Sequence, residues 1–186
     1  MGAVSYLRFI QILNDKYMTV TLRAISIAEI QEIAESGLLA GEKFAAGALP
    51  PPFVAQRSLT QIATGKSIEW CGNYFIVRND DHMIVGGCGF KDTPLNGRVE
   101  IGYGVAPECQ GQGIATVAVR ALLAAAFASV QVDEVLAQIN PANIASIRVA
   151  EKLNFVRGDT QLEEDNEVLD QWLVKKSHGF CLEVAA

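Results

Sequence analysis

The sequence is poor in the residues that build metal sites and disulfide frameworks. Its 186 residues include two histidines and four cysteines, and no two cysteines form a CxxC pair. We therefore expect no metal site, and we expect reduced, mostly buried thiols of the kind found in cytoplasmic proteins. The cysteines are Cys71, Cys88, Cys109 and Cys181.

Basic charge and long apolar runs are also scarce. The chain has 15 Lys and Arg against 21 Asp and Glu, a net charge of −6, and no segment concentrates the basic residues. This argues against nucleic acid or an anionic membrane surface as a partner. No apolar run reaches transmembrane length, and the stretch FIQIL near the N-terminus is too short for a secretory signal. The expected location is the cytoplasm.

What the sequence does have is enough apolar residues for one compact core, since they make up 50% of the chain. We expect an N-terminal extension (1–17) with a loose helical stripe, one domain (18–176) and a C-terminal tail (177–186). Periodicity in the domain predicts the order β-α-α-β-β-β-α-β-α-β-β, which is a single mixed α/β (α+β) fold. Ser26 and Glu29 have capping-box spacing, and Asn140 is expected to cap a later helix.

The most unusual segment is PECQGQGIATVAVRALLAAA, residues 107–126. Gly111 and Gly113 precede an amphipathic helix whose first turn has no bulky or charged side chain. Such a helix start exposes unpaired N–H groups and the positive end of the helix dipole, to which a phosphate can bind closely. A glycine-rich turn that only joins strand to helix is the alternative.

Two familiar phosphate-binding loops do not match this segment. A P-loop requires Lys and Ser or Thr after the last glycine, whereas Ile114 and Ala115 follow Gly113. The dinucleotide fingerprint requires a third glycine where this chain has Thr116. These comparisons leave a pyrophosphate site that uses backbone donors alone.

The residues around this loop resemble the acyl-CoA signature of the GNAT N-acyltransferase superfamily. The motifs are Val105-Ala106-Pro107, then Gln110-x-x-Gly113-x-Ala115, and then INPANIASIRVAEKLNF with Asn143, Ser146 and Leu153-Asn154-Phe155. The segment GCGF…RVEIGYGVAPE is similar to the branch that contains ribosomal-protein N-terminal acetyltransferases. The resemblance runs from about Met18 to Lys176.

The resemblance implies a fold, a cofactor and a binding site. The fold is a central mixed, twisted sheet of about seven strands, splayed between the fourth and fifth strands, with helices on both faces. The cofactor is acetyl-CoA, whose pantetheine arm lies in the gap beside Gly102 and Gly104. For these two glycines, plain packing is the alternative. The implied cofactor-binding residues are Val105, Gln110, Gly111, Gln112, Gly113, Ile114, Ala115, Asn143 and Ser146.

Two residues are the candidates for proton transfer. Glu100 lies in an apolar strand on the same face as the two glycines, and we expect it to accept the proton of the attacking amine; a structural ion pair is the alternative. Many superfamily members have a tyrosine at the position of Ala150 that protonates the thiolate. Ser146 is the remaining hydroxyl for this role, unless it only binds backbone or pantetheine. Tyr103 points to the opposite face and is expected in the core.

The acceptor is expected to be a primary amine. At pH 7, deprotonating a lysine costs about 4.6 kcal/mol and an α-amine about 1.1 kcal/mol, which favours a protein N-terminus. Residues 41–69 and the last hairpin should line the acceptor side, with Phe44, Phe53 and Trp70 mainly in the core. A small-molecule or antibiotic acetyltransferase and a non-catalytic acyl-CoA-binding regulatory domain remain alternatives. A homodimer through the C-terminal strands or the N-terminal extension is left open.

Overall fold

A single mixed β-sheet organises the chain. The computed structural model describes residues 9–12, 20–162 and 167–176. In this part of the chain, eight strands form one sheet in the order β1-β2-β3-β4-β5-β6-β8-β7. Neighbouring strands are antiparallel except β5 and β6, which are parallel. The strands are β1 (Phe9–Ile12), β2 (Val20–Ala24), β3 (Asn73–Arg78), β4 (Met83–Phe90), β5 (Arg98–Val105), β6 (Glu134–Ile139), β7 (Val156–Leu162) and β8 (Val168–Lys175).

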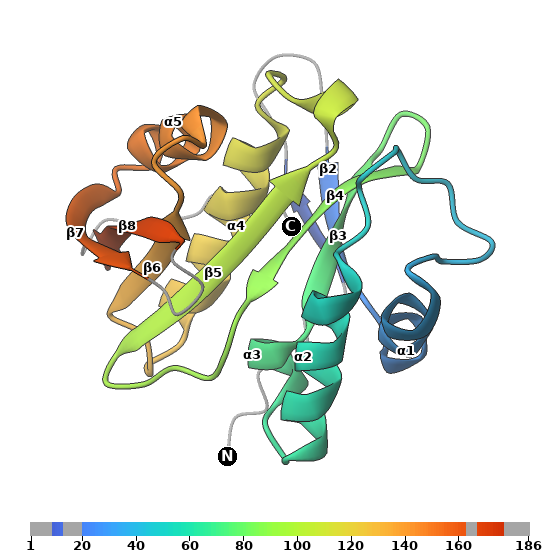
Figure 1. The fold of residues 1–186 in the computed structure, drawn as a ribbon, viewed down its shortest axis with the longest axis horizontal. Helices are drawn as coiled ribbons and strands as arrows, with labels where there is room; N and C mark the ends of the chain where they lie inside the picture. Colours follow the sequence, from blue (N-terminus) through green and yellow to red (C-terminus); the bar gives the residue numbers. More distant parts are fainter. Residues whose placement is uncertain (1–8, 13–19, 163–166, 177–186) are drawn as a thin grey trace.

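Helices cover both faces of the sheet, as the resemblance implies. Helices α1 to α3 lie on one side of the sheet and α4 lies on the other (Figure 1). On the first side, Trp70 of α3 packs on Phe90 of β4, with 4.8 Å between the ring centroids. The helices are α1 (Ile27–Ser36), α2 (Pro52–Ala63), α3 (Ile68–Cys71), α4 (Ile114–Ala128) and α5 (Ile144–Lys152), and a 3-10 turn spans Pro107–Cys109.

The predicted seven strands correspond to β2 through β8, and β1 is an addition. Periodicity predicted a helical stripe in the N-terminal extension, but Phe9–Ile12 forms a strand that pairs antiparallel with β2. The free edge of β2 explains this difference, because its unpaired N–H and C=O groups favour pairing with a further strand. The rest of the extension and residues 177–186 lie outside the described residues.

The helix ends follow their capping residues, with one correction. Ser26 and Glu29 form the predicted capping box of α1. Helix α5, however, begins at Ile144 with Asn143 as its N-cap, whose side chain accepts a hydrogen bond from the Ser146 N–H at 3.1 Å. Asn140 was therefore wrongly predicted as the cap. Its side chain instead accepts from the Ala142 N–H at 2.9 Å, which closes a local turn before the helix.

The sheet opens between β5 and β6. Their parallel pairing runs from Arg98 and Glu134 to Ile101 and Ala137, and there it ends. Strand β5 continues to Val105 beside β4, while β6 continues to Ile139 beside β8. The predicted fourth and fifth strands are β5 and β6 once β1 is counted, so the predicted splay is confirmed.

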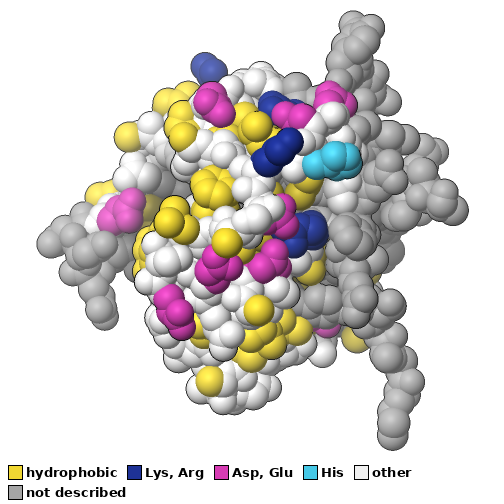
Figure 2. Space-filling view, turned by 90° about the vertical axis from the view of Figure 1, so that its right-hand side faces the viewer, with side chains coloured by type: hydrophobic (Ala, Val, Ile, Leu, Met, Phe, Trp, Pro, Cys, Tyr) yellow, Lys and Arg dark blue, Asp and Glu magenta, His cyan; other side chains and the backbone are white. Residues whose placement is uncertain are grey.

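The surface agrees with the charge pattern of the sequence. Figure 2 shows the side on which α1 lies, where Asp and Glu side chains are scattered among hydrophobic ones. The described Lys and Arg side chains on this face lie singly or in small groups among them (Figure 2). Among the described residues, none of the helices is both long and apolar enough to span a bilayer.

Candidate active site

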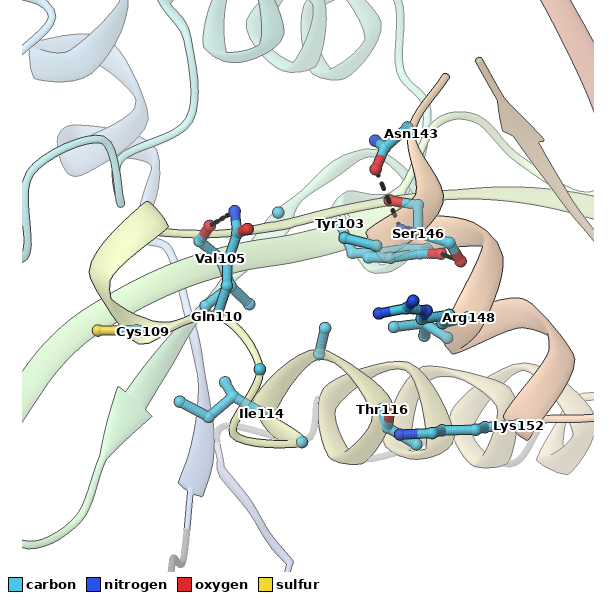
Figure 3. A pocket seen from close by; sticks show the side chains of 16 residues that line it. Tyr103, Val105, Cys109, Gln110, Ile114, Thr116, Asn143, Ser146, Arg148 and Lys152 are labelled. Carbon is cyan, nitrogen blue, oxygen red and sulfur yellow. Dashed lines mark hydrogen bonds between the residues drawn. The ribbon is translucent and has the colours of Figure 1, made fainter. Parts of the chain in front are cut away.

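A groove of about 490 Å³ lies where β5 leaves β6, between the end of β5, the start of α4 and one face of α5 (Figure 3). Strand β5 positions one wall because its backbone is no longer paired on this side. The residues that line the groove are Tyr103, Gly104, Val105, Cys109, Gln110, Gly111, Gly113, Ile114, Ala115, Thr116, Asn143, Ala145, Ser146, Arg148, Val149 and Lys152.

The loop before α4 exposes the start of that helix to the groove. Gly111 and Gly113 have φ values of 74° and 82°, in the left-handed region that favours glycine. Gly113 is the N-cap of α4 and makes no side-chain capping bond. The N–H groups of the first turn are thus not satisfied by a capping side chain, and they adjoin the groove together with the positive end of the helix dipole. Gln110 holds the loop in place, because its Nε2 donates to the Val105 carbonyl at 3.1 Å.

The structure brings most of the predicted cofactor-binding residues together. Every one of them lines the groove except Gln112, which is exposed and donates from Nε2 to the Glu108 carbonyl at 3.4 Å. Asn143 and Ser146 are held together by the N-cap hydrogen bond of α5. Their roles toward a ligand stay predictions, and a role for the side chain of Gln112 has no support from its position.

Sequence reasoning missed two cations of the groove. Arg148 and Lys152 extend from α5 into the space between α5 and α4 (Figure 3). Neither forms an ion pair with a described residue, and the lining of the groove includes no Asp or Glu. An anion would therefore meet two positive side chains as well as the backbone donors of α4. The signal in the sequence was the helical spacing of Ala145, Arg148, Val149 and Lys152, which places them on one face.

Tyr103 packs against the core as predicted, but it also has a position that the sequence did not predict. It is half-buried and lines the groove, and its hydroxyl donates to the main-chain carbonyl of Ser146 at 3.1 Å. Burial raises the pKa of Tyr103 to about 12, so the phenol stays protonated at neutral pH. The side chains of Tyr103 and Glu100 do lie on opposite faces of β5, as strand alternation predicts. At Tyr103, however, its face of the strand borders the groove. Ala150, by contrast, is buried.

Glu100 lies close to the opening of the sheet without lining the groove. It belongs to the part of β5 that is still paired with β6, opposite Leu136. Its carboxylate forms an ion pair with Lys91, and its side chain is 25% exposed. The ion pair that the sequence left as an alternative is therefore present, and the role of Glu100 as a base stays a prediction.

A second cavity, of about 480 Å³, lies against β4, β5 and α2. Tyr103, Gly104 and Val105 line both this cavity and the groove, so the two meet at the end of β5. Residues 47–54 contribute much of its wall, and they belong to the segment 41–69 that the sequence predicts to line the acceptor side. We call it the acceptor cavity after this prediction. Phe53 is 70% exposed at this wall, so its assignment to the core was wrong; Trp70 is buried and Phe44 packs against the core.

The three described cysteines are buried. Cys71, Cys88 and Cys109 are free and buried, as predicted, and Cys181 lies outside the described residues. Burial raises the pKa of the Cys71 and Cys88 thiols, which keeps them protonated and unreactive. No cluster of His, Cys, Asp and Glu suited to a metal ion occurs among the described residues.

Comparison with known families identifies this arrangement. The family described as Acetyltransferase (GNAT) domain matches residues 19–156. The chain belongs to the GNAT acetyltransferase family. The resemblance that the motifs indicated is thus confirmed, and the match includes the loop before α4 and helix α5.

The curated relatives of this GNAT chain are themselves described only as acetyltransferases. It is 34% identical over 101 residues to "Uncharacterized N-acetyltransferase p20" of Bacillus licheniformis, which covers 53% of this chain and 57% of that protein. It is 32% identical over 85 residues to "Uncharacterized N-acetyltransferase YjdG" of Bacillus subtilis, and this alignment covers 45% of this chain and 51% of that protein. The aligned part thus spans about half the length of each relative.

Solved structures share the fold at low sequence identity. RimL, a ribosomal alpha-N-protein acetyltransferase in complex with coenzyme A, matches with a TM-score of 0.63 and 17% identity over 90% of this chain and 97% of that one. The ribosomal-protein-S5-alanine acetyltransferase of Vibrio fischeri matches with a TM-score of 0.65 and 20% identity, and the match covers 91% of this chain and 98% of that one. An aminoglycoside acetyltransferase in complex with coenzyme A matches with a TM-score of 0.60 and 21% identity, and the match covers 84% of this chain and 95% of that one. Neighbours with protein and small-molecule acceptors therefore share this GNAT fold.

Proposed function

We propose that this GNAT chain transfers an acetyl group from acetyl-CoA to a primary amine, with a protein N-terminal α-amine as the favoured acceptor. One observation carries the proposal: a groove built for an anionic ligand meets a second cavity at the open end of β5. The cofactor and the acceptor would approach the same backbone from two sides. Direct transfer in a ternary complex requires this arrangement.

The residues present fit coenzyme A. The uncapped start of α4 and the cations of Arg148 and Lys152 would bind its phosphates. The unpaired edge of β5 at Gly102–Val105 would bind the pantetheine arm, and Asn143 and Ser146 form the opposite wall. When bound, acetyl-CoA supplies an activated acetyl thioester.

The reaction then requires two proton transfers. Glu100 accepts the proton of the amine through a water molecule, since its carboxylate lines neither the groove nor the acceptor cavity. Lys91 lines the acceptor cavity and is paired with Glu100, so the pair links that cavity to the base. Ser146 would donate a hydrogen bond to the departing sulfur, and the thiolate would take its proton from water. Tyr103 fixes the helix turn that carries Ser146 through its hydrogen bond to the Ser146 carbonyl.

Release of free thiol from acetyl-CoA with a panel of amines tests the proposal. In that assay Glu100→Gln should lower kcat about 100-fold and change the pH profile, because general-base catalysis contributes this much. Glu134→Gln is the matched control, since Glu134 also forms an ion pair at the β5–β6 seam, with Arg98. It should keep the wild-type rate and profile.

Other outcomes would replace parts of the proposal. If Glu100→Gln kept the wild-type pH profile, Glu100 would have no role as a base. If acetyl-CoA bound but no amine increased thiol release above hydrolysis, the chain would be a non-catalytic acyl-CoA-binding domain. If only small amines such as aminoglycosides were acetylated, and no peptide, the protein N-terminus would be excluded as acceptor.

A further inference from the structure

The acceptor cavity has an unusual charge for a protein that binds amines. Its lining residues include the cations Arg57 and Lys91 and no Asp or Glu. Lys91 is neutralised by its ion pair with Glu100, whereas Arg57 forms no ion pair with a described residue. The cavity is therefore positively charged, and Arg57 is the source of the uncompensated charge.

Arg57 is also short of hydrogen-bond partners. It projects from α2 and is half-buried, and its Nε atom is fully buried without a hydrogen-bond partner. A buried donor on a charged group is costly unless a ligand or water satisfies it. A guanidinium presents its donors in a planar fork that matches the two oxygens of a carboxylate.

The remaining wall of the cavity is largely apolar. Leu49, Pro50, Pro51, Phe53 and Val54 line it, and Phe53 leaves 70% of its surface exposed. This surface suits an apolar body attached to the charged group. A polyamine or an aminoglycoside carries several positive charges, and it would meet Arg57 without a carboxylate to balance them.

We propose that the acceptor is an amine that also carries a carboxylate, which Arg57 binds, with an apolar portion against Leu49 and Phe53. This inference rests on the proposed acetyl transfer and names its substrate class. The same chemistry is offered by a free apolar amino acid and by a peptide with an acidic residue next to its N-terminal α-amine. The test distinguishes these two sources.

The kinetic test uses pairs of acceptors that differ only in the carboxylate. The free amino acid pair is phenylalanine and phenylalanine amide, and the peptide pair is Ala-Glu-Phe amide and Ala-Gln-Phe amide. In one pair the carboxylate member should have kcat/KM about 10-fold or more above its partner, the size expected of a charged hydrogen bond. The pair that shows the preference identifies the source.

Three variants assign the preference to Arg57. Arg57→Met should raise KM for the carboxylate acceptor about 30-fold and abolish the preference, with KM for acetyl-CoA unchanged. Arg57→Lys should restore part of the preference, and melting temperatures show that both variants fold. Arg120→Met is the control, because Arg120 is exposed on α4 and lines neither cavity. It should behave as wild type.

A binding measurement separates this inference from the proposed function. Calorimetry with CoA-saturated protein should show binding of N-acetylphenylalanine or of acetylated Ala-Glu-Phe amide to wild type and at least 10-fold weaker binding to Arg57→Met. Such binding without any turnover would overturn acetyl transfer and keep the carboxylate site. Equal turnover of both members of each pair, preference for spermidine, or an Arg57→Met variant like wild type would overturn the carboxylate site.

Discussion

Strands β4 and β5 are neighbours, and both carry glycines, but Gly86 and Gly89 of β4 are crowded whereas Gly104 of β5 is not. A Cβ on Gly86 of β4 would lie 2.2 Å from the Gly104 carbonyl oxygen, and one on Gly89 would lie 2.9 Å from that of Gly72. A Cβ on Gly104 of β5 would meet no protein atom within 4 Å. Gly86 and Gly89 in β4 allow backbones to pack closely, whereas Gly104 in β5 leaves a space that the protein does not fill.

This contrast decides an alternative that the sequence left open. For Gly102 and Gly104, plain packing was the competing explanation. It is wrong for Gly104, and at Gly102 a Cβ would only touch the flexible end of Lys91, with Cε at 3.7 Å. The open space adjoins both cavities, because Gly104 lines the groove and the acceptor cavity.

The largest effect on stability should come from adding a side chain at Gly86, where β4 has no room for one. Gly86→Ala should destabilise the fold by about 3 kcal/mol, because its Cβ would overlap the backbone of β5. A loss of this size corresponds to a decrease in Tm of roughly 6–12 °C in calorimetry. Gly87→Ala is the matched control in the same strand, since its Cβ would meet only the Tyr74 carbonyl at an ordinary 3.5 Å. An equal loss in both variants would show that close approach of the strands is not the cause.

The same substitution in β5 should separate activity from stability. Gly104→Ala should change the free energy of unfolding by less than about 1 kcal/mol, because the new methyl group meets no protein atom. It should lower kcat/KM about 10-fold, since it fills space between the two cavities where substrates would meet. Chemical denaturation and the thiol-release assay on one preparation measure both quantities. Wild-type activity would show that substrates do not use this space.

The smallest effect should come from Tyr103, which lies between the two glycines of β5. Tyr103→Phe should lose about 1 kcal/mol of stability with the hydrogen bond to the Ser146 carbonyl. Because burial raises the folded-state pKa of Tyr103 to about 12, the wild-type advantage should be complete below the unfolded pKa of about 10 and should decline from there to pH 12.

Denaturation of both proteins between pH 8 and pH 11, with absorbance titration of the tyrosines, tests this expectation. With the range extended to pH 12, the variant should lack the tyrosine that ionises near pH 12. A stability difference that stays constant across the range would contradict a raised pKa for Tyr103.

The order of the elements could be predicted because it depends on local signals. Capping at Ser26, the turn residues of the hairpins and the apolar periodicity of α4 act within a few neighbouring residues. The glycine loop at 111–113 was found for the same reason, since its positive φ values require glycine wherever the loop lies.

The predictions that were wrong or incomplete depended on which surfaces meet. Phe53 has an apolar aromatic side chain of the kind expected in a core, but it lies exposed at the acceptor cavity. Tyr103 points to the face that the strand pattern predicts, but the opening of the sheet turns part of that face into a groove. Periodicity reports which side of an element is buried, and it does not report what covers that side.

The sequence by itself determined the family, the order of the strands from β2 to β8, and the glycine-rich start of α4, because each depends on residues close together in the chain. Only the tertiary structure decided the charge of the two cavities. Arg57 of α2 and the pair Arg148 and Lys152 of α5 come from elements far apart in the sequence, and their fields add only where the fold brings them around the open end of β5. Electrostatic attraction depends on distance in space, and spacing along the chain does not specify that distance.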